Sequence, residues 1–264
     1  MKKRLSILLA IILATTMLTA CGSKQKTGIE GIKERGKMVV GLDDSFPPMG
    51  FRDDNNEIVG FDIDLANEVG KILGVEVELK PVVWETVAMS LNNGDIDMIW
   101  NGYTISEARK KEVLFSEPYL TNQQIIVVGP DSDIEGKADL AGKTVALQAG
   151  STSQDALEKD VEVFESIEDV RKFENNVDAL LDLKVGRVDA VIVDSVVGRY
   201  YTSLHPEDYF VVDDSFMDEF YGIGMRKEDK SFADAINQAL EELRENGTAG
   251  EISKKWFSED VFID

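Results

Sequence analysis

The stretch NGYTISEARKKEVLFSEPY, residues 101–119, places a threonine and an arginine five positions apart, directly after a short apolar run. That run, residues 96–100, follows a glycine typical of a helix end and is predicted to be a buried strand. Thr104 and Arg109 are therefore expected at the carboxyl end of a strand, where open α/β sheets bind ligands. A planar guanidinium beside a hydroxyl and free backbone N–H groups suits a carboxylate.

An Asn-Gly pair, Asn101 and Gly102, turns the chain after the predicted strand, and Ser106 is predicted to cap a short helix carrying Arg109. Taken alone, a surface helix cap with solvated cations would explain the residues equally well. The nineteen residues together, however, resemble the signature of the family-3 extracellular solute-binding proteins, which deliver amino acids to ABC importers. The resemblance runs from about residue 29 to the C-terminus.

The resemblance implies an α/β fold of the periplasmic-binding-protein-like type II, with two lobes joined by a two-segment hinge and a ligand cleft between them. In the family the first lobe is interrupted by the second. We therefore expect lobe 1 at residues 29–122 and 221–264, and lobe 2 at residues 123–220. Such a hinge permits closure of the lobes around a ligand.

An internal echo also suggests two similar units. Residues 91–99 read LNNGDIDMI and residues 183–191 read LKVGRVDAV, and each predicts a helix end, a glycine stop and a buried strand. We predict helices at 62–73, 85–92, 167–185 and 229–246 and strands at 76–81 and 190–193. The predicted helix 167–185 rests on apolar residues at helical spacing.

The N-terminus predicts export. Three basic residues precede an apolar run at 7–14, and small residues precede Cys21, the sole cysteine. Residues 1–20 are predicted to be a secretory signal peptide, too short for a confident membrane span. The site around Cys21 also resembles a bacterial lipobox, which implies lipidation of Cys21, a flexible tether at 22–28 and a lipid-anchored protein on the outer face of the cell membrane.

The negative net charge argues against anionic partners. The chain has a net charge of −22, and loss of residues 1–20 removes three positive charges and no negative one, which leaves −25. Such an excess argues against nucleic acid and against broad contact with anionic lipid. We expect a monomer that contacts the membrane through its lipid anchor alone.

Further site residues follow from the resemblance. The loop at 40–51, VGLDDSFPPMGF, matches a family loop that places an acid and an aromatic in the pocket, here Asp43 and Phe46. Trp84 matches a second family aromatic. In lobe 2, ALQAGSTSQDAL at 146–157 resembles the second carboxylate-binding loop, with Gln148 and Thr152, and Asp194 matches the aspartate for the ligand ammonium. Structural alternatives are a Pro-rich turn, core aromatics and ordinary helix caps.

The resemblance implies one binding mode. Arg109, the amide of Thr104 and the Thr152 loop would hold an α-carboxylate, whereas Asp194, the Thr104 hydroxyl and the Gly102 carbonyl would hold an α-ammonium. These are charge-assisted bonds that strengthen when a closing cleft excludes water. The closed form is then what a permease would recognise.

The cargo is predicted from the remaining polar residues. No second cation is placed to meet a distal carboxylate, so glutamate and aspartate are disfavoured. Asp43, with Asp62 either as its neighbour or as a helix N-cap, favours a cation or hydrogen-bond donor, and Asn101 and Gln148 suit neutral polar groups. We expect a basic or polar amino acid: arginine, lysine, glutamine or cystine.

Two other classes are weighed against a transport protein. Some proteins of this fold resemble cyclohexadienyl dehydratases, and a catalytic carboxylate among fifty acids is an open alternative. The sole histidine, His205, leaves no Ser-His-Asp triad and no His-rich metal site, and no phosphate-binding or dinucleotide glycine motif occurs. We expect no cofactor and no metal. A sensor ectodomain would need a transmembrane segment and an output domain.

Overall fold

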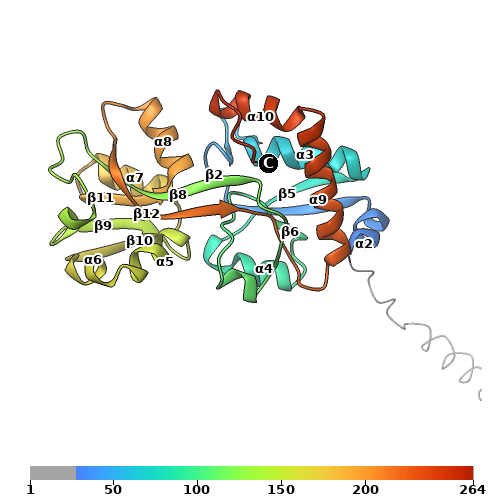
Figure 1. Cartoon of the computed structure of the whole chain (residues 1–264), viewed down its shortest axis with the longest axis horizontal. Coiled ribbons are helices and arrows are strands. Elements are labelled where there is room, and N and C mark those ends of the chain that lie inside the picture. Colours follow the sequence, from blue (N-terminus) through green and yellow to red (C-terminus); the bar gives the residue numbers. More distant parts are fainter. Residues whose placement is uncertain (1–27, 264) are drawn as a thin grey trace, which may run out of the picture.

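The computed structural model describes residues 28–263, and two five-stranded mixed sheets divide them into two α/β lobes (Figure 1). The sheet of lobe 1 has the strand order β5-β1-β6-β13-β7, and that of lobe 2 the order β10-β9-β11-β8-β12. Helices cover both faces of each sheet. The predicted fold class is confirmed.

Lobe 1 is built from both ends of the described chain. Its strands are β1 (Lys37–Leu42), β5 (Glu76–Pro81), β6 (Met98–Ile99), β7 (Leu114–Phe115), β13 (Gly224–Met225) and the small sheet β2 (Ser45–Phe46), β3 (Gly50–Arg52), β4 (Ile58–Val59). Its helices are α2 (Gly28–Arg35), α3 (Phe61–Leu73), α4 (Val87–Asn92), α9 (Lys230–Glu245) and α10 (Thr248–Phe257), with 3-10 turns η1 (Trp84–Thr86) and η2 (Arg109–Lys111). Strand β1 pairs in parallel with β5 and β6.

Lobe 2 holds the middle of the chain. Its strands are β8 (Leu120–Val128), β9 (Thr144–Gln148), β10 (Asp169–Phe173), β11 (Ala190–Asp194) and β12 (Phe210–Tyr221). Its helices are α5 (Thr152–Lys159), α6 (Val161–Ser166), α7 (Asn176–Lys184) and α8 (Ser195–Leu204), with the 3-10 turn η3 (Lys137–Leu140).

Two paired strands connect the lobes. Strands β8 and β12 run antiparallel, with Leu120 opposite Tyr221 and Val128 opposite Phe210. Figure 1 shows them side by side, extending from lobe 2 toward lobe 1. Tyr221 also forms an isolated bridge with Thr104 of lobe 1. The start of β8 and the end of β12 therefore lie next to the predicted site.

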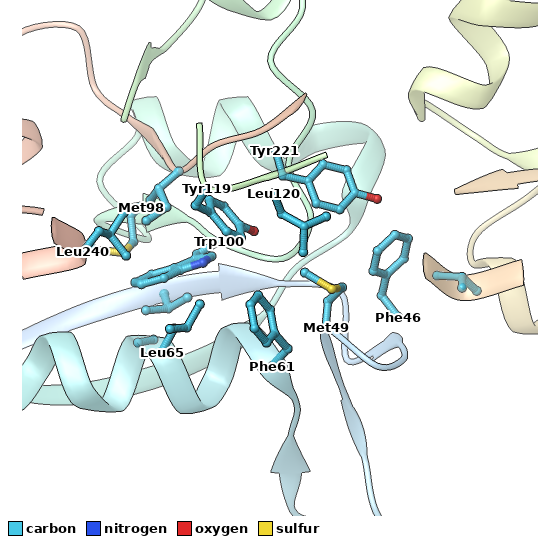
Figure 2. Packing of buried hydrophobic residues seen from close by; sticks show 14 of the residues in the cluster. Phe46, Met49, Phe61, Leu65, Met98, Trp100, Tyr119, Leu120, Tyr221 and Leu240 are labelled. Atoms are coloured by element: carbon cyan, nitrogen blue, oxygen red, sulfur yellow. The ribbon is translucent and has the colours of Figure 1, made fainter. Parts of the chain in front are cut away.

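The core of lobe 1 contains α9, which corresponds to the helix predicted at 229–246. In α9, Phe232 and Ile236 are fully buried, and Leu243 is nearly so. Figure 2 shows Trp100, at the end of the β6 segment, packed near Tyr119, and their ring centroids lie 6.3 Å apart. Truncation of a buried aromatic such as Phe232 to alanine typically costs about 3–5 kcal/mol.

The helix predicted at 167–185 is wrong. The segment forms an edge strand, β10, and then a separate helix, α7. Asn175 caps α7 by accepting a hydrogen bond from the amide of Asp178, and this cap starts a new element in the middle of the predicted one. The supposed apolar face does not exist, because Leu181 and Val185 are 50% and 58% exposed.

The other elements differ in length. Strand β6 covers only two residues of the predicted 96–100, and the predicted helix 85–92 begins as the turn η1. Helix α3 matches its prediction closely and ends at Gly74, whose φ of 71° is readily adopted only by glycine. The terminal helix α10 was not predicted.

The predicted signal peptide, Cys21 and most of the tether lie outside the described residues. Gly28, the last residue of the predicted tether, instead begins α2, and its amide donates to Asp229 Oδ1 at 2.8 Å. None of the helices within residues 28–263 is long and apolar enough to span a membrane.

Candidate functional site

Eight of the ten predicted site residues line one small cavity between the lobes. Lobe 1 contributes five of them, and Gln148, Thr152 and Asp194 come from lobe 2. The lining residues are Phe46, Trp84, Gly102, Thr104, Arg109, Gln148, Ser151, Thr152 and Asp194. Asp43 and Asn101 lie behind this lining.

Gly102 is held by a buried carboxylate. Its amide donates to Asp62 Oδ2 at 2.8 Å, and the hydroxyl of Tyr119 donates to the same oxygen at 2.9 Å. The suggestion that Asp62 caps its helix is wrong, because Gly60 occupies the N-cap position without a side-chain bond. Burial raises the pKa of Asp62 to about 7.

Arg109 bridges the two lobes. Its Nη1 donates to the Thr104 carbonyl at 3.2 Å, and its Nη2 donates to the Gly150 carbonyl of lobe 2 at 3.3 Å. The guanidinium lies 4.3 Å from the ring centroid of Tyr103, within cation–π range. Ser106 accepts a bond from the Arg109 amide, but the turn is 3-10 and its N-cap position is Ala108 rather than the predicted Ser106. These contacts fix the guanidinium at the edge of the cavity.

Aromatic rings close one side of the cavity. Phe46 and Trp84 are 4% and 8% exposed, and Trp84 packs edge-on against Tyr103 at 5.6 Å. Gly102 has a φ of 60°, and a Cβ there would lie 2.8 Å from Phe46 Cε1. The close approach of this ring therefore requires glycine.

Asp43 and Gln148 meet across the cleft. Gln148 Nε2 donates to Asp43 Oδ2 at 2.7 Å, and Ser45 donates to Asp43 Oδ1 from both its amide and its hydroxyl. Burial raises the pKa of Asp43, and these bonds oppose the rise. Asn101 accepts from the Asp43 amide at 3.2 Å, so it fixes the loop that carries the acid.

The start of α5 faces the cavity. Ser151 caps this helix by accepting from the Gln154 amide, and Thr152 is its first residue. The Thr152 hydroxyl lies 3.2 Å from that of Thr104, so a residue of each lobe meets here. A helix N-terminus offers unpaired amides and a positive dipole end, which suits an anion.

Asp194 ends β11 and does not cap α8 with its side chain. Its Oδ1 instead accepts from Asn122 Nδ2 at 2.8 Å, Gln124 Nε2 at 2.9 Å and the Tyr221 hydroxyl at 2.7 Å. Burial raises the pKa of Asp194 to about 7, and the nearby Glu219 carboxylate adds to the rise.

Four residues that bond or adjoin Asp194 were not predicted as site residues: Asn122, Gln124, Glu219 and Tyr221. All four are buried and belong to the paired strands β8 and β12. Residues 121–124 of β8 are all polar, and the alternation of the strand buries Asn122 and Gln124 while Thr121 is exposed. Alternation does not reveal which partner strand buries them.

A cluster of possible metal ligands lies away from the cleft cavity. His205, Glu207 and Asp208 offer ligand atoms within 4.8 Å of one another. Asp208 is paired with Lys184 at 2.6 Å, and none of the three residues lines the cleft cavity. The residues around the cavity itself are donors and acceptors suited to a small zwitterion.

Comparison with known proteins identifies the chain. Residues 38–259 match the family described as bacterial extracellular solute-binding proteins, family 3. The L-cystine-binding protein of Escherichia coli (strain K12) is 34% identical over 232 residues, which cover 87% of this chain and 86% of that protein. The arginine-binding extracellular protein of Bacillus subtilis (strain 168) is 33% identical over 98% of this chain and 99% of its own length.

A solved structure gives the same result. The substrate-binding protein of an ABC uptake transporter from Streptococcus pneumoniae, with bound histidine, superposes with a TM-score of 0.86. The two sequences are 34% identical, and the match covers 89% of this chain and 98% of that protein's chain. The family consists of solute-binding proteins rather than enzymes, which sets the dehydratase alternative aside. The chain belongs to the bacterial extracellular solute-binding proteins, family 3.

Proposed function

We propose that this protein is the amino-acid-binding component of an ABC importer and that its cargo is a basic or polar L-amino acid. One observation carries the proposal. A cation, the N-terminus of a helix and a buried acid, contributed by both lobes, converge on one cavity, as polar groups do in a ligand site.

Arg109 and the start of α5 would hold the α-carboxylate. The guanidinium is fixed by its bonds to the Thr104 and Gly150 carbonyls, so little side-chain entropy is lost on binding. The amides at Thr152 and Ser153 begin a helix, and amides at such a position suit an anion. The Thr104 amide completes this half of the site.

Asp194 would hold the α-ammonium together with the Thr104 hydroxyl and the Gly102 carbonyl. Asp194 is 4% exposed, and an ion pair formed there is shielded from water. Phe46 and Trp84 exclude water from the same cavity. Each contact is stronger in the closed cleft than in an open one.

Closure would couple binding to transport. The contacts between Thr104 and Thr152, and between Asp43 and Gln148, join the lobes in the arrangement described here. A ligand that touches both lobes stabilises the closed state and shifts the population toward it. We assign lobe 1 to residues 29–122 and 221–264 and lobe 2 to residues 123–220, with β8 and β12 as the hinge, and the permease as the partner of the closed form.

The cargo follows from Asp43 and Gln148. A buried acid disfavours glutamate and aspartate, because two carboxylates would face each other in a desolvated cleft. Arginine, lysine, glutamine and cystine each carry a donor or a cation for Asp43. Two relatives named for L-cystine and arginine agree with this range.

The N-terminus would anchor the protein. Removal of residues 1–20 and lipidation of Cys21 would leave a monomer tethered to the outer face of the cell membrane. Cys21→Ser should release the protein from membranes without changing its affinity for the amino acid. Integral membrane association of that variant would show that the N-terminal segment itself is the anchor.

Thermal-shift screening tests the cargo. Residues 22–264 would be screened against the twenty amino acids plus ornithine and cystine. A ligand at one hundred times its dissociation constant stabilises the folded state by about 2.7 kcal/mol, which is readily measured. We expect the largest shifts from arginine, lysine, glutamine or cystine. If glutamate gave the largest shift, the role proposed for Asp43 would be rejected. If no amino acid gave a shift, the proposed function would be rejected.

A further inference from the structure

Asp194 has a second buried acid beside it, Glu219 on the hinge strand β12. The same two amide groups bond both carboxylates. Asn122 Nδ2 lies 2.8 Å from Asp194 Oδ1 and 3.1 Å from Glu219 Oε2, and Gln124 Nε2 lies 2.9 Å from each of these oxygens. The two carboxylates are therefore close neighbours in a site removed from water.

Glu219 also touches the cavity lining. Its Oε2 accepts from the Thr104 hydroxyl at 2.9 Å and from the Thr152 hydroxyl at 3.2 Å. Glu219 is 4% exposed, and its other oxygen, Oε1, has no hydrogen-bond partner among residues 28–263. A buried carboxylate oxygen without a donor is costly when the group is charged.

Few charges compensate this pair. Strand β8 offers only the amides of Asn122 and Gln124, and α5 offers the Thr152 hydroxyl. The remaining titratable groups that face Asp194 are Tyr221, whose hydroxyl donates to it, and Arg109 from lobe 1. Two adjacent carboxylates that share donors and face a single cation, Arg109, do not ionise independently.

We propose that Asp194 and Glu219 share one proton in the unliganded protein and that the α-ammonium of the bound amino acid displaces it. The inference rests on the proposed function, since it assigns Glu219 to the ammonium end of the same site. Glu219 is thus a second acid of this site that the sequence did not reveal.

The proton balance is simple. Before binding, one of the two carboxyls carries a proton and the pair has one negative charge. The ammonium then donates hydrogen bonds to both carboxylates, and the carboxyl proton passes to solvent. One proton is released per amino acid bound, so affinity rises with pH up to the carboxyl's pKa and levels off above it.

The first test needs no ligand. The assigned side-chain carboxyl carbons of the purified protein would be titrated by NMR from pH 4 to pH 9. We expect the Asp194 signal to move with a midpoint above pH 6. In Glu219→Gln the Asp194 midpoint should fall by at least one pH unit, whereas that of Asp62 should not change.

The second test counts the proton. Calorimetry with L-arginine, L-lysine, L-glutamine and L-cystine in two buffers of different ionisation enthalpy would measure release at pH 6. We expect close to one proton for wild type, with affinity falling roughly tenfold per pH unit below the carboxyl's pKa. Glu219→Gln should release no more than about half a proton, because its Asp194 midpoint falls by at least one pH unit. Asp218→Asn is the matched control, because Asp218 is the exposed neighbour on the same strand and loses the same charge.

The outcomes separate the two claims. Titration of Asp194 below pH 5 would overturn the shared proton even if amino acids bind. Binding of an amino acid without proton release at pH 6 would overturn it as well. Absence of binding by every amino acid in the screen would reject the proposed function, yet the unliganded titration would still report on the pair. If Glu219→Gln did not fold, the wild-type titration would decide.

Discussion

Gln148 of lobe 2 donates a hydrogen bond from Nε2 to Asp43 Oδ2 of lobe 1 over 2.7 Å. The same amide group donates to the Glu174 carbonyl at 2.9 Å, and its oxygen accepts from Asn176. Gln148 is therefore anchored in lobe 2 before it reaches Asp43. The bond holds the two lobes together and stabilises the charged form of the acid that we propose faces the ligand side chain.

Asp43→Asn should separate cationic from neutral cargo. The substitution keeps the shape and one acceptor but removes the charge, so arginine or lysine should lose roughly 1.5 to 3 kcal/mol of binding free energy, the range for hydrogen bonds to charged groups. Glutamine should lose less than about 1 kcal/mol. Calorimetric titration of wild type and variant with arginine and glutamine measures both. Equal losses for the two amino acids would mean that Asp43 does not contact the side chain.

Arg109→Ala should nearly abolish binding of every amino acid while the fold persists. Removal of one partner of a buried charged pair costs roughly 3 to 5 kcal/mol, which is two to four orders of magnitude in affinity. Calorimetry gives the affinity, and circular dichroism checks the fold. Lys111→Ala is the control, since this exposed lysine lies in the same turn and removes the same charge. An affinity within a few-fold of wild type for Arg109→Ala would reject the carboxylate assignment.

Helices whose sequence carries a local signal, such as an apolar face or a terminal glycine, were predicted from the sequence. The apolar face of α9 and the glycine end of α3 are both written within a few neighbouring residues, and both elements lie where they were expected. The segment 167–185 failed for a local reason as well. Its apolar residues occur at helical spacing, but the Asn175 cap divides them into a strand and a helix.

The site residues, like the helices and strands, were predicted only where a local sequence motif marks them. The residues carried by matched motifs, such as Arg109 and Asp194, do surround one cavity. Glu219 was missed because its burial depends on the pairing of β12 with β8, far away in the sequence, and not on its neighbours. Nothing local distinguishes it from the exposed Asp218 beside it. A buried acid on a strand can be recognised only when the sheet that buries it is known.

Gly102→Ala should destabilise the protein and weaken binding together. Its φ of 60° costs an L-residue roughly 1–2 kcal/mol, and the new Cβ would lie 2.8 Å from Phe46 and 3.1 Å from Tyr221. Gly94→Ala is a matched control, because Gly94 has a φ of 81° but a Cβ added there would meet no heavy atom within 4 Å. Urea denaturation should show a larger loss for Gly102→Ala, by roughly 1–3 kcal/mol of overpacking.

Only Gly102→Ala should also reduce amino-acid affinity, by more than tenfold, because the clash displaces the ring that closes the cavity. Calorimetry on both alanine variants checks this. Equal affinities would show that the Phe46 ring can retreat without disturbing the site.

Asp194→Asn should stabilise the unliganded protein at high pH while it removes binding. Burial raises the pKa of Asp194 to about 7 from an ordinary value near 3.8. Between these two values the folded state holds a proton that the unfolded state has lost, so the free energy of unfolding falls as pH rises, and the loss is complete above pH 7. Asparagine does not titrate and can still accept from Asn122, Gln124 and Tyr221. The variant should therefore gain roughly 1 to 3 kcal/mol over wild type at pH 8.

The pH dependence provides the control for this gain. Asp62 has a pKa raised in the same direction by burial, so part of the decline in stability between pH 5 and pH 8 should persist in Asp194→Asn. Urea denaturation of both proteins at pH 5, 6.5 and 8 measures the difference. We expect the advantage of the variant to grow steadily with pH and to be smallest at pH 5. A variant that is less stable than wild type at pH 8 would show that the Asp194 carboxylate stabilises the fold in its charged form, and the cost would then have to be sought at Glu219.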